Sequence, residues 1–154
     1  MNKQNIILIG MPGAGKSSVG VILAKVLGYE FIDTDLVIQH REKRLLREII
    51  ADEGNEGFLA IENEVNATLE ADKSVIAPGG SAIYGKEAME HFKEIGTIVY
   101  LKLSYEDLAK RLGNLKGRGV VLKEGQTLKD LYDERSKLYE QYAEITVDES
   151  GRDI

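Results

Sequence analysis

Ile6-Ile7-Leu8-Ile9 runs directly into Gly10-Met11-Pro12-Gly13-Ala14-Gly15-Lys16-Ser17, and this stretch decides the fold class. A short, continuous apolar run is typical of a strand that is buried on both faces of a sheet. Residues 10–15 break that strand, and a helical apolar pattern follows over 18–27 until Gly28 ends it. A strand, a glycine-rich loop and a helix in this order predict a cradle of backbone N–H groups around one phosphate group, backed by the positive end of the helix.

The same loop predicts how a nucleotide would be held. Lys16 would reach the β- and γ-phosphates, and the Ser17 hydroxyl would bind Mg²⁺. Ser18 could donate a hydrogen bond to the α-phosphate. The backbone N–H groups that face the phosphates would come from Gly13, Ala14 and Gly15. The pattern Gly-x-x-x-x-Gly-Lys-Ser therefore predicts ATP and Mg²⁺ as cofactors. The alternative is a glycine-rich turn that binds nothing.

Strands and helices alternate along the rest of the chain. Further strands are expected at 31–32, 74–77, 97–101 and 145–147. Helices are expected at 36–53 with a break near 43–44, then at 58–69, at 86–94, after Ser104, and from Thr127 to about 143. This alternation predicts an α/β fold with a parallel sheet and helices on both faces. Ligands of such sheets collect at the carboxyl ends of the strands, where the loops after residues 9, 32 and 77 would lie.

Composition narrows the class of protein. The chain has 154 residues, 43% of them hydrophobic, which suits one compact domain over residues 1–154. It has no cysteine, which excludes disulfides and cysteine-based metal sites. A formal net charge of −6 argues against a general nucleic-acid binder, whose surface would be basic. No apolar run approaches the roughly 18 residues of a membrane span, and the polar start is unlike a signal peptide. We therefore expect a cytoplasmic monomer that binds neither nucleic acid nor membrane.

Two carboxylates follow the second predicted strand. Asp33 and Asp35 flank Thr34, and residues two apart on an extended chain share a face, so both could point into the cleft. One could order Mg²⁺ or its waters, and the other could accept a hydrogen bond from a substrate hydroxyl and help to remove its proton. The alternative is structural, with Asp33 ending a strand and Asp35 capping the next helix.

These motifs resemble the shikimate kinase family over nearly the whole chain. The loop Gly10–Ser17 and the Asp33-Thr34-Asp35 pattern both match. Glu53–Phe58 followed by Glu62 matches in part the family's Gly-Glu-x-x-Phe-Arg-x-x-Glu. Ala77–Ser81 stands where the family has Ala-Thr-Gly-Gly-Gly. The arginines that fall at the family's adenine-side, lid and substrate positions are Arg111, Arg118 and Arg135.

The resemblance implies a fold and a reaction. The fold would be a five-stranded parallel sheet flanked by helices, a P-loop NTPase fold of the nucleoside monophosphate kinase-like type, with a lid loop at about 112–125. The reaction would be transfer of the γ-phosphoryl group of ATP to a small hydroxylated substrate. For the family's own substrate, shikimate, the product would be 3-phosphoshikimate.

The family's residue roles carry over to matching positions. Asp33 would serve the Mg²⁺ shell, and Asp35 would hold and activate the acceptor hydroxyl. Arg118 would close over the phosphates, with Lys16, while Arg135 would bind the substrate carboxylate. The adenine-side arginine is Arg111. Backbone N–H groups for the substrate would come from Gly79 and Gly80. A lone arginine can equally be a solvated surface residue, which is the alternative for each of the three.

The chain also departs from the family pattern on the acceptor side. The family's Phe-Arg is Phe58-Leu59 here, and leucine cannot form a bidentate bond to a carboxylate. Losing one such partner would cost about 1.5–3 kcal/mol of binding free energy. Pro78 replaces a threonine and removes one backbone donor, and Ser81 replaces the third glycine.

Three interpretations remain open from the sequence. The first is a shikimate kinase with a weakened acceptor site. The second is a kinase of another small hydroxylated acceptor, such as a homoserine-like amino acid, a sugar acid or a polyol, which Leu59 and Ser81 favour. The third is a non-catalytic, nucleotide-binding regulatory module. The presence of Lys16 and of both carboxylates argues against the third, because a module without catalysis has no need of them.

Overall fold

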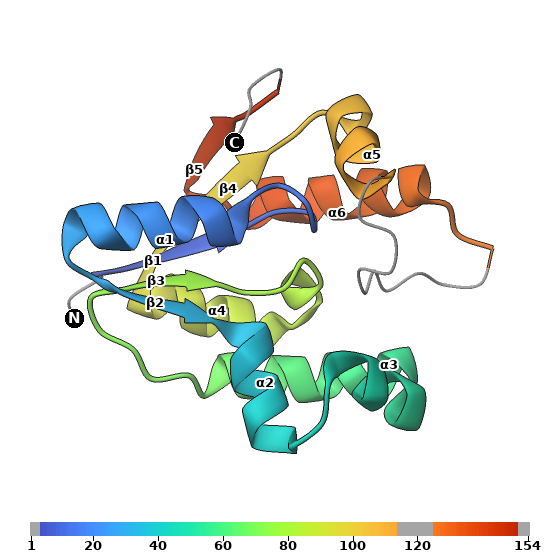
Figure 1. Cartoon of the computed structure of the whole chain (residues 1–154), viewed down its shortest axis with the longest axis horizontal. Coiled ribbons are helices and arrows are strands. Elements are labelled where there is room, and N and C mark those ends of the chain that lie inside the picture. The colour runs from blue at the N-terminus through green and yellow to red at the C-terminus, as the bar shows by residue number, and fades with distance from the viewer. Residues whose placement is uncertain (1–3, 114–124, 151–154) are drawn as a thin grey trace.

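A five-stranded parallel sheet forms the centre of the protein, as predicted (Figure 1). The computed structural model describes residues 4–113 and 125–150. The strands lie in the order β2-β3-β1-β4-β5, and every neighbouring pair is parallel. Their bounds are β1 Asn5–Ile9, β2 Glu30–Asp33, β3 Ser74–Ala77, β4 Gly96–Lys102 and β5 Ile145–Asp148. The central strand is therefore β1, the strand that leads into the glycine-rich loop.

Helices cover both faces of this sheet. Helix α1 lies along one face, and α4 and α6 lie along the other, while α2 and α3 pack together beyond β2 (Figure 1). Their bounds are α1 Lys16–Leu27, α2 Thr34–Glu42, α3 Leu46–Ala67, α4 Lys86–Ile95, α5 Tyr105–Gly113 and α6 Leu128–Tyr142, with a short 3₁₀ helix η1 at Ala82–Tyr84. No helix among the described residues is long and apolar enough to cross a membrane.

The apolar run of β1 is buried on both faces, which is what its continuous pattern indicated. Ile7 and Ile9 point to the α4 and α6 side, where they join a cluster that includes Ile98. Leu8 points to the α1 side and packs in a second cluster with Ala24 of α1. Alternating side chains of one strand thus supply two separate cores.

The α2–α3 region differs in detail from the expected helix bounds. Helix α2 begins at Thr34, two residues earlier than expected, because Asp33 caps it. The predicted break near 43–44 is confirmed, since Lys43 adopts a left-handed conformation with φ of 55°. Gly54 interrupts α3 within the gap expected between the helices at 36–53 and 58–69, with φ of 76° and ψ of 174°. Gly57 lies in the same expected gap but is helical, so the interruption is shorter than expected.

Asn5 ties together three connections at the amino edge of the sheet. Its side-chain amide nitrogen donates to the carbonyl oxygens of Ala71 (2.9 Å) and Ile95 (3.0 Å). Its side-chain oxygen accepts from the backbone N–H of Ser74 at 3.0 Å. The residue is only 3% exposed, so water cannot readily replace these bonds. Asn5 therefore fixes the starts of β3 and β4 relative to β1.

We predict that Asn5→Ala destabilises the fold without touching the site. Three buried or part-buried backbone groups would lose their partner, which should lower the free energy of unfolding by about 3 kcal/mol. Urea denaturation at equilibrium measures the change. A loss below about 1 kcal/mol, or a changed dependence on urea, would show that these bonds do not carry the stability assigned to them.

Candidate active site

The glycine-rich loop leaves the carboxyl end of β1 and turns tightly into α1. Gly10 adopts φ of 153°, and a Cβ added to it would lie 2.8 Å from the carbonyl oxygen of Leu101, so only glycine fits beside β4. Gly15 has φ of 87° and precedes α1 without any side-chain cap. Ser17 and Ser18 lie exposed in the first turn of α1. The helix therefore begins with backbone donors and two hydroxyls open to an anionic ligand.

Lys16 lies over this loop. Its ammonium group donates to the carbonyl oxygens of Gly10 (2.6 Å) and Met11 (3.0 Å). The backbone N–H of Ala14 donates to the same Met11 oxygen at 3.1 Å, which closes the turn. The ammonium is thus held at the mouth of the loop, where phosphate oxygens of a nucleotide would meet it. The loop and its lysine fit the triphosphate of ATP.

Asp33 ends β2, as the structural alternative from the sequence stated. It is also the residue that caps α2, a role which that alternative gave to Asp35. Its Oδ1 accepts from the backbone N–H of Asp35 at 2.9 Å, so Asp33 both ends β2 and caps α2. Asp35 lies in the first turn of α2 rather than at its cap. The two carboxylates therefore come from one strand end, and the cap holds the backbone of Asp35 in place.

Asp35 and Glu62 meet at Gly79. A Cβ added to Gly79 would lie 2.9 Å from Asp35 Oδ1 and 3.0 Å from Glu62 Oε2, so both carboxyl groups converge on this glycine. Glu62 is 2% exposed. Its Oε1 accepts from the Ser81 hydroxyl at 2.6 Å, and its Oε2 has no hydrogen-bond partner among the described residues. Glu62 belongs to the site although sequence reasoning gave it no role.

The pKa of Glu62 is raised from 4.5 to about 7. Burial is the largest cause, because it penalises the charged form. The Ser81 hydrogen bond lowers this pKa, the charge of Asp35 raises it, and the positive charges of Arg135 and Lys16 lower it. Glu62 therefore gains and loses its proton near neutral pH inside the site.

Arg135 and Gly80 form the other side of the site. A Cβ added to Gly80 would lie 2.8 Å from Pro12 Cδ and 2.9 Å from Arg135 Nη1, so Gly80 is enclosed between the phosphate loop and α6. Arg135 is 1% exposed, which rules out the solvated alternative for this arginine. The Tyr139 hydroxyl donates to the Gly80 carbonyl oxygen at 2.7 Å. The Arg135 guanidinium also lies 5.5 Å from the centre of the Tyr84 ring.

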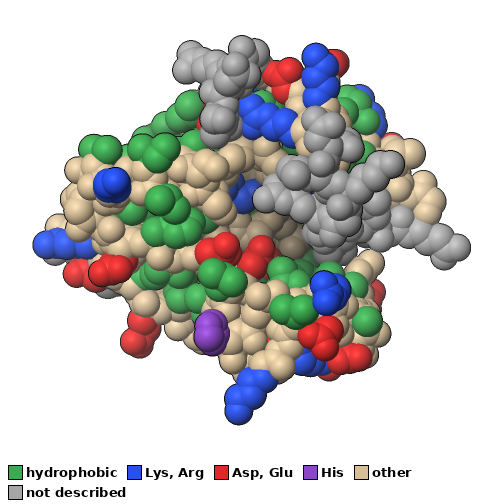
Figure 2. All heavy atoms as spheres, in the orientation of Figure 1, with side chains coloured by type: hydrophobic (Ala, Val, Ile, Leu, Met, Phe, Trp, Pro, Cys, Tyr) green, Lys and Arg blue, Asp and Glu red, His purple; other side chains and the backbone are tan. Residues whose placement is uncertain are grey.

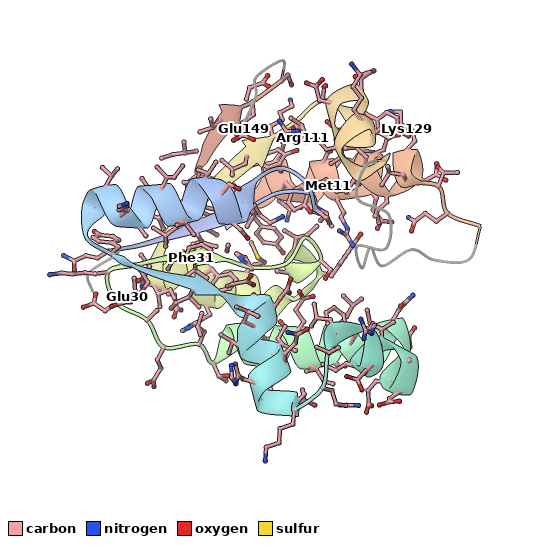
Figure 3. All side chains as sticks on the ribbon, viewed as in Figure 1. Met11, Glu30, Phe31, Arg111, Lys129 and Glu149 are labelled. Atoms are coloured by element: carbon pink, nitrogen blue, oxygen red, sulfur yellow. The ribbon has the colours of Figure 1, made fainter. Side chains whose placement is uncertain are left out.

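Arg111 lies on α5, above the phosphate loop, where it and Met11 can be followed in Figure 3. Its Nη1 donates to the carbonyl oxygen of Gly13 at 3.0 Å. The contact places this arginine beside the loop that would hold the phosphates. Arg118 and residues 114–124 of the expected lid lie outside the described residues.

The site residues thus come from six segments that meet at the carboxyl edge of the sheet. Figure 2 shows acidic side chains and a recessed basic side chain near the centre of the face turned to the viewer. Within 4–113 and 125–150 there is no group of three or more histidine, cysteine or acidic residues that could hold a metal ion. Mg²⁺ commonly takes one or two protein ligands and fills its shell with waters and phosphate oxygens. A hydroxyl such as that of Ser17 and a carboxylate such as that of Asp33 are ligand types that such an ion accepts.

Comparison with known proteins identifies the family of this chain. A family model described as shikimate kinase matches residues 12–154. The chain belongs to the shikimate kinase family. Shikimate kinase 2 of Yersinia enterocolitica serotype O:8 / biotype 1B is 34% identical, over 94% of this chain and 86% of that protein. The protein is accordingly an ATP-dependent phosphotransferase with an alcohol acceptor, and kinases of this family use ATP and Mg²⁺.

Solved structures agree with this assignment. A shikimate kinase from Acinetobacter baumannii, described as in complex with shikimate, superposes with a TM-score of 0.82 at 36% identity, over 94% of this chain and 82% of that one. A thymidylate kinase from Candida albicans superposes with a TM-score of 0.59 at 16% identity, over 97% and 85% of the two chains. The second likeness concerns the fold alone, and it confirms the nucleoside monophosphate kinase-like class.

We predict that Glu62→Gln becomes relatively more stabilising as pH rises. The folded state binds the Glu62 proton more tightly than the unfolded state, so wild-type stability from this group is lost as pH rises from about 4.5 to about 7. Glutamine has no such loss. The unfolding free energy of the variant should therefore gain about 3 kcal/mol on the wild type across this range.

Urea denaturation of both proteins at several pH values measures this difference. Carboxyl groups far from Glu62 titrate alike in both chains and cancel in the comparison. A difference that stays constant with pH would contradict a raised pKa at Glu62.

Proposed function

We propose that the protein transfers the γ-phosphoryl group of ATP to a hydroxyl of shikimate, which gives 3-phosphoshikimate and ADP. The observation that carries the proposal is the convergence of a phosphate loop, a carboxylate and a buried arginine on one glycine pair, Gly79 and Gly80. A phosphoryl donor, an acceptor hydroxyl and an acceptor carboxylate would each have a partner there. The relative from Acinetobacter baumannii, described as in complex with shikimate, supports this acceptor.

The donor half of the site would bind ATP. The backbone N–H groups of Gly13 and Gly15 would hold the phosphates, and that of Ala14 would join them by exchanging the Met11 oxygen for a phosphate oxygen. Lys16 would exchange its two carbonyl partners for β- and γ-phosphate oxygens, and Ser18 would donate to the α-phosphate. Ser17 would bind Mg²⁺, and Asp33 would serve the shell of ligands and waters around this ion. The ion would neutralise phosphate charge. Arg111 would lie along the adenine, and we place Arg118 over the phosphates as part of a lid.

The acceptor half would orient the substrate. Asp35 would accept a hydrogen bond from the reacting hydroxyl, while Gly79 and Gly80 offer backbone N–H groups. Arg135 would bind the carboxylate of the acceptor, and its burial makes this charge-assisted bond stronger than it would be in water. The acceptor is thereby held at both ends, with one hydroxyl directed at the phosphate loop.

The transfer would proceed by positioning and charge neutralisation. The acceptor oxygen forms a bond to the γ-phosphorus while the bond from that phosphorus to the β,γ-bridging oxygen breaks, and ADP carries away the electron pair. The proton of the acceptor hydroxyl passes to the Asp35 carboxylate. Lys16, and Arg118 in the proposed lid, would stabilise the charge on the transferred group.

One observation favours a second class of acceptor. Leu59 lies on α3 and packs beside an apolar cluster that contains Phe58 and Ile38, so position 59 offers no cation to a carboxylate. A small hydroxylated acceptor with less need of two cations, such as a homoserine-like amino acid, a sugar acid or a polyol, would fit this arrangement. The regulatory-module interpretation has no such support, since the chain belongs to a family of kinases.

We also infer that residues 1–154 act as one domain and as a monomer in the cytoplasm. One chain carries both the donor half and the acceptor half of the site. Its donor, ATP, is plentiful in the cytoplasm. Light scattering on a size-exclusion column would test the monomer at working concentration.

A coupled assay for ADP release tests the acceptor. We expect turnover of shikimate with a KM in the ordinary micromolar-to-millimolar range. Homoserine and gluconate serve as competing acceptors in the same panel. Turnover of one of these alone would replace shikimate as the substrate, and ADP release no faster than the acceptor-free background with all three would overturn the kinase assignment.

We predict that Lys16→Ala removes phosphoryl transfer and leaves the fold intact. The loss of the ammonium at the loop should lower kcat/KM by at least about a hundredfold. Lys25→Ala is the matched control, because Lys25 lies exposed in the last turn of the same helix. Equal activity of the two variants would refute the role of Lys16, and equal unfolding midpoints would show that both are folded.

A further inference from the structure

We propose that Ser81 is a positioning residue for the acceptor, because its buried bond to Glu62 holds that carboxyl group away from Arg135 and keeps Asp35 and Arg135 aligned on either side of Gly79 and Gly80. This inference rests on the proposed function. It assigns a role to a serine where the family pattern has glycine, and to a glutamate that the reaction itself does not use.

The contact between Ser81 and Glu62 is short and enclosed. The hydroxyl donates to Oε1 at 2.6 Å, and the two residues are 7% and 2% exposed. Both belong to elements that define the site, since Ser81 opens the turn that follows Gly80 and Glu62 lies on α3. A hydrogen bond to a carboxylate in such surroundings is about twice as strong as one between neutral groups. The pair therefore fixes the turn at Gly79–Ser81 against α3.

The turn itself has few other ties. Backbone bonds close it locally, from the Ala82 N–H to the Gly79 oxygen (3.1 Å) and from the Tyr84 N–H to the Ser81 oxygen (3.1 Å). The Tyr139 hydroxyl holds its Gly80 carbonyl from the α6 side. Ser81 supplies the corresponding bond from the α3 side. Gly79 and Gly80 are thus held between two helices by one side chain from each direction.

Glu62 needs this bond because its surroundings offer little else. Its Oε2 has no partner among the described residues, and Asp35 adds a second negative group beside it. Leu59 lies three residues earlier on α3, at the helical spacing from which a cation could reach Glu62, and it carries no charge. A buried carboxylate without a partner is costly, so it either takes up a proton or turns toward the nearest cation. Two positive charges act on Glu62, those of Arg135 and Lys16, and the effect of Arg135 is the larger, so Glu62 would turn toward Arg135.

Removing the hydroxyl would therefore disturb the acceptor and spare the nucleotide. Without the Ser81 hydroxyl, a charged Glu62 would compete with the acceptor carboxylate for Arg135. It would also repel the Asp35 carboxylate across Gly79. The phosphate loop does not depend on this turn for its own backbone bonds. The effect should appear in the KM for the acceptor and not in the KM for ATP.

Steady-state kinetics with shikimate and ATP both varied test the proposal. Ser81→Ala should raise the KM for shikimate about tenfold, while the KM for ATP changes by less than about twofold. Ser81→Thr, which keeps the hydroxyl, should restore most of the affinity. Ser74→Ala is the matched control, since Ser74 is also buried and donates to a backbone oxygen, that of Asp72, at the opposite end of β3. It should leave both KM values unchanged.

A second pair of variants tests the link to position 59. Leu59→Arg in the Ser81→Ala background would give Glu62 a cation one helical turn away, so it should lower the KM for shikimate at least about threefold relative to Ser81→Ala alone. The pH dependence of kcat/KM for shikimate is a further readout. The hydroxyl favours the charged form of Glu62, and the groups that face Glu62 are Asp35, Arg135 and Lys16. Ser81→Ala should raise the pKa of Glu62, and so it should move the part of the profile that reports the titration of Glu62 to higher pH.

The outcomes distinguish a failure of the proposed function from a failure of the role assigned to Ser81. A wild-type chain that turns over no acceptor overturns the proposed function and this inference with it. If the wild type is active but Ser81→Ala leaves the KM for its acceptor within about twofold, the inference alone is wrong. It is equally wrong if both KM values rise together and the unfolding midpoint falls, or if the pH profile does not move, because Ser81 would then serve stability only.

Discussion

The parallel pairing of β1 with both β3 and β4 is the constraint on which the site depends. It places the carboxyl end of β1 at the middle of the sheet edge, with the ends of β3 and β4 beside it. The chain must leave that crowded point within one residue, and the Leu101 carbonyl oxygen leaves no room for a side chain at Gly10. The glycine-rich loop, the start of α1 and the turn after β3 are all brought together by this one arrangement of strands.

Charge balance is the second constraint, and it acts on the acceptor half. The charges of Asp35, Arg135 and Lys16 all act on Glu62, which is buried together with Arg135. Each carboxyl group there must be matched by a cation, a hydroxyl or a proton. The exchange of charge at position 59 for a hydroxyl at position 81 would keep the balance without an additional arginine. Two departures from the family pattern can in this way be one compensated change.

The sequence predicted those parts of the fold that local patterns determine. The strands with continuous apolar runs, the loop before Lys16 and the break at Lys43 depend on neighbours within a few residues. A helix-capping role was raised only as an alternative, and it was given to Asp35, whereas the structure has Asp33 as the cap. Which residue caps a helix depends on where the helix begins.

Contacts between distant residues could not be predicted in this way. The bond from Ser81 to Glu62 spans 19 residues and that from Tyr139 to Gly80 spans 59, and no periodic pattern encodes either. The burial of Arg135 likewise follows from how α6 packs, which its charged sequence concealed. For Glu62 the only signal in the sequence was its place in a partly matched motif.

The two carbonyl contacts of Lys16 have a consequence for how the loop receives a nucleotide. By donating to the Gly10 and Met11 oxygens, Lys16 at the end of the loop is bonded to the start of the loop. These bonds hold the loop in one conformation. Preorganisation of this kind lowers the entropy lost when a triphosphate arrives, since the loop is already in its receiving shape.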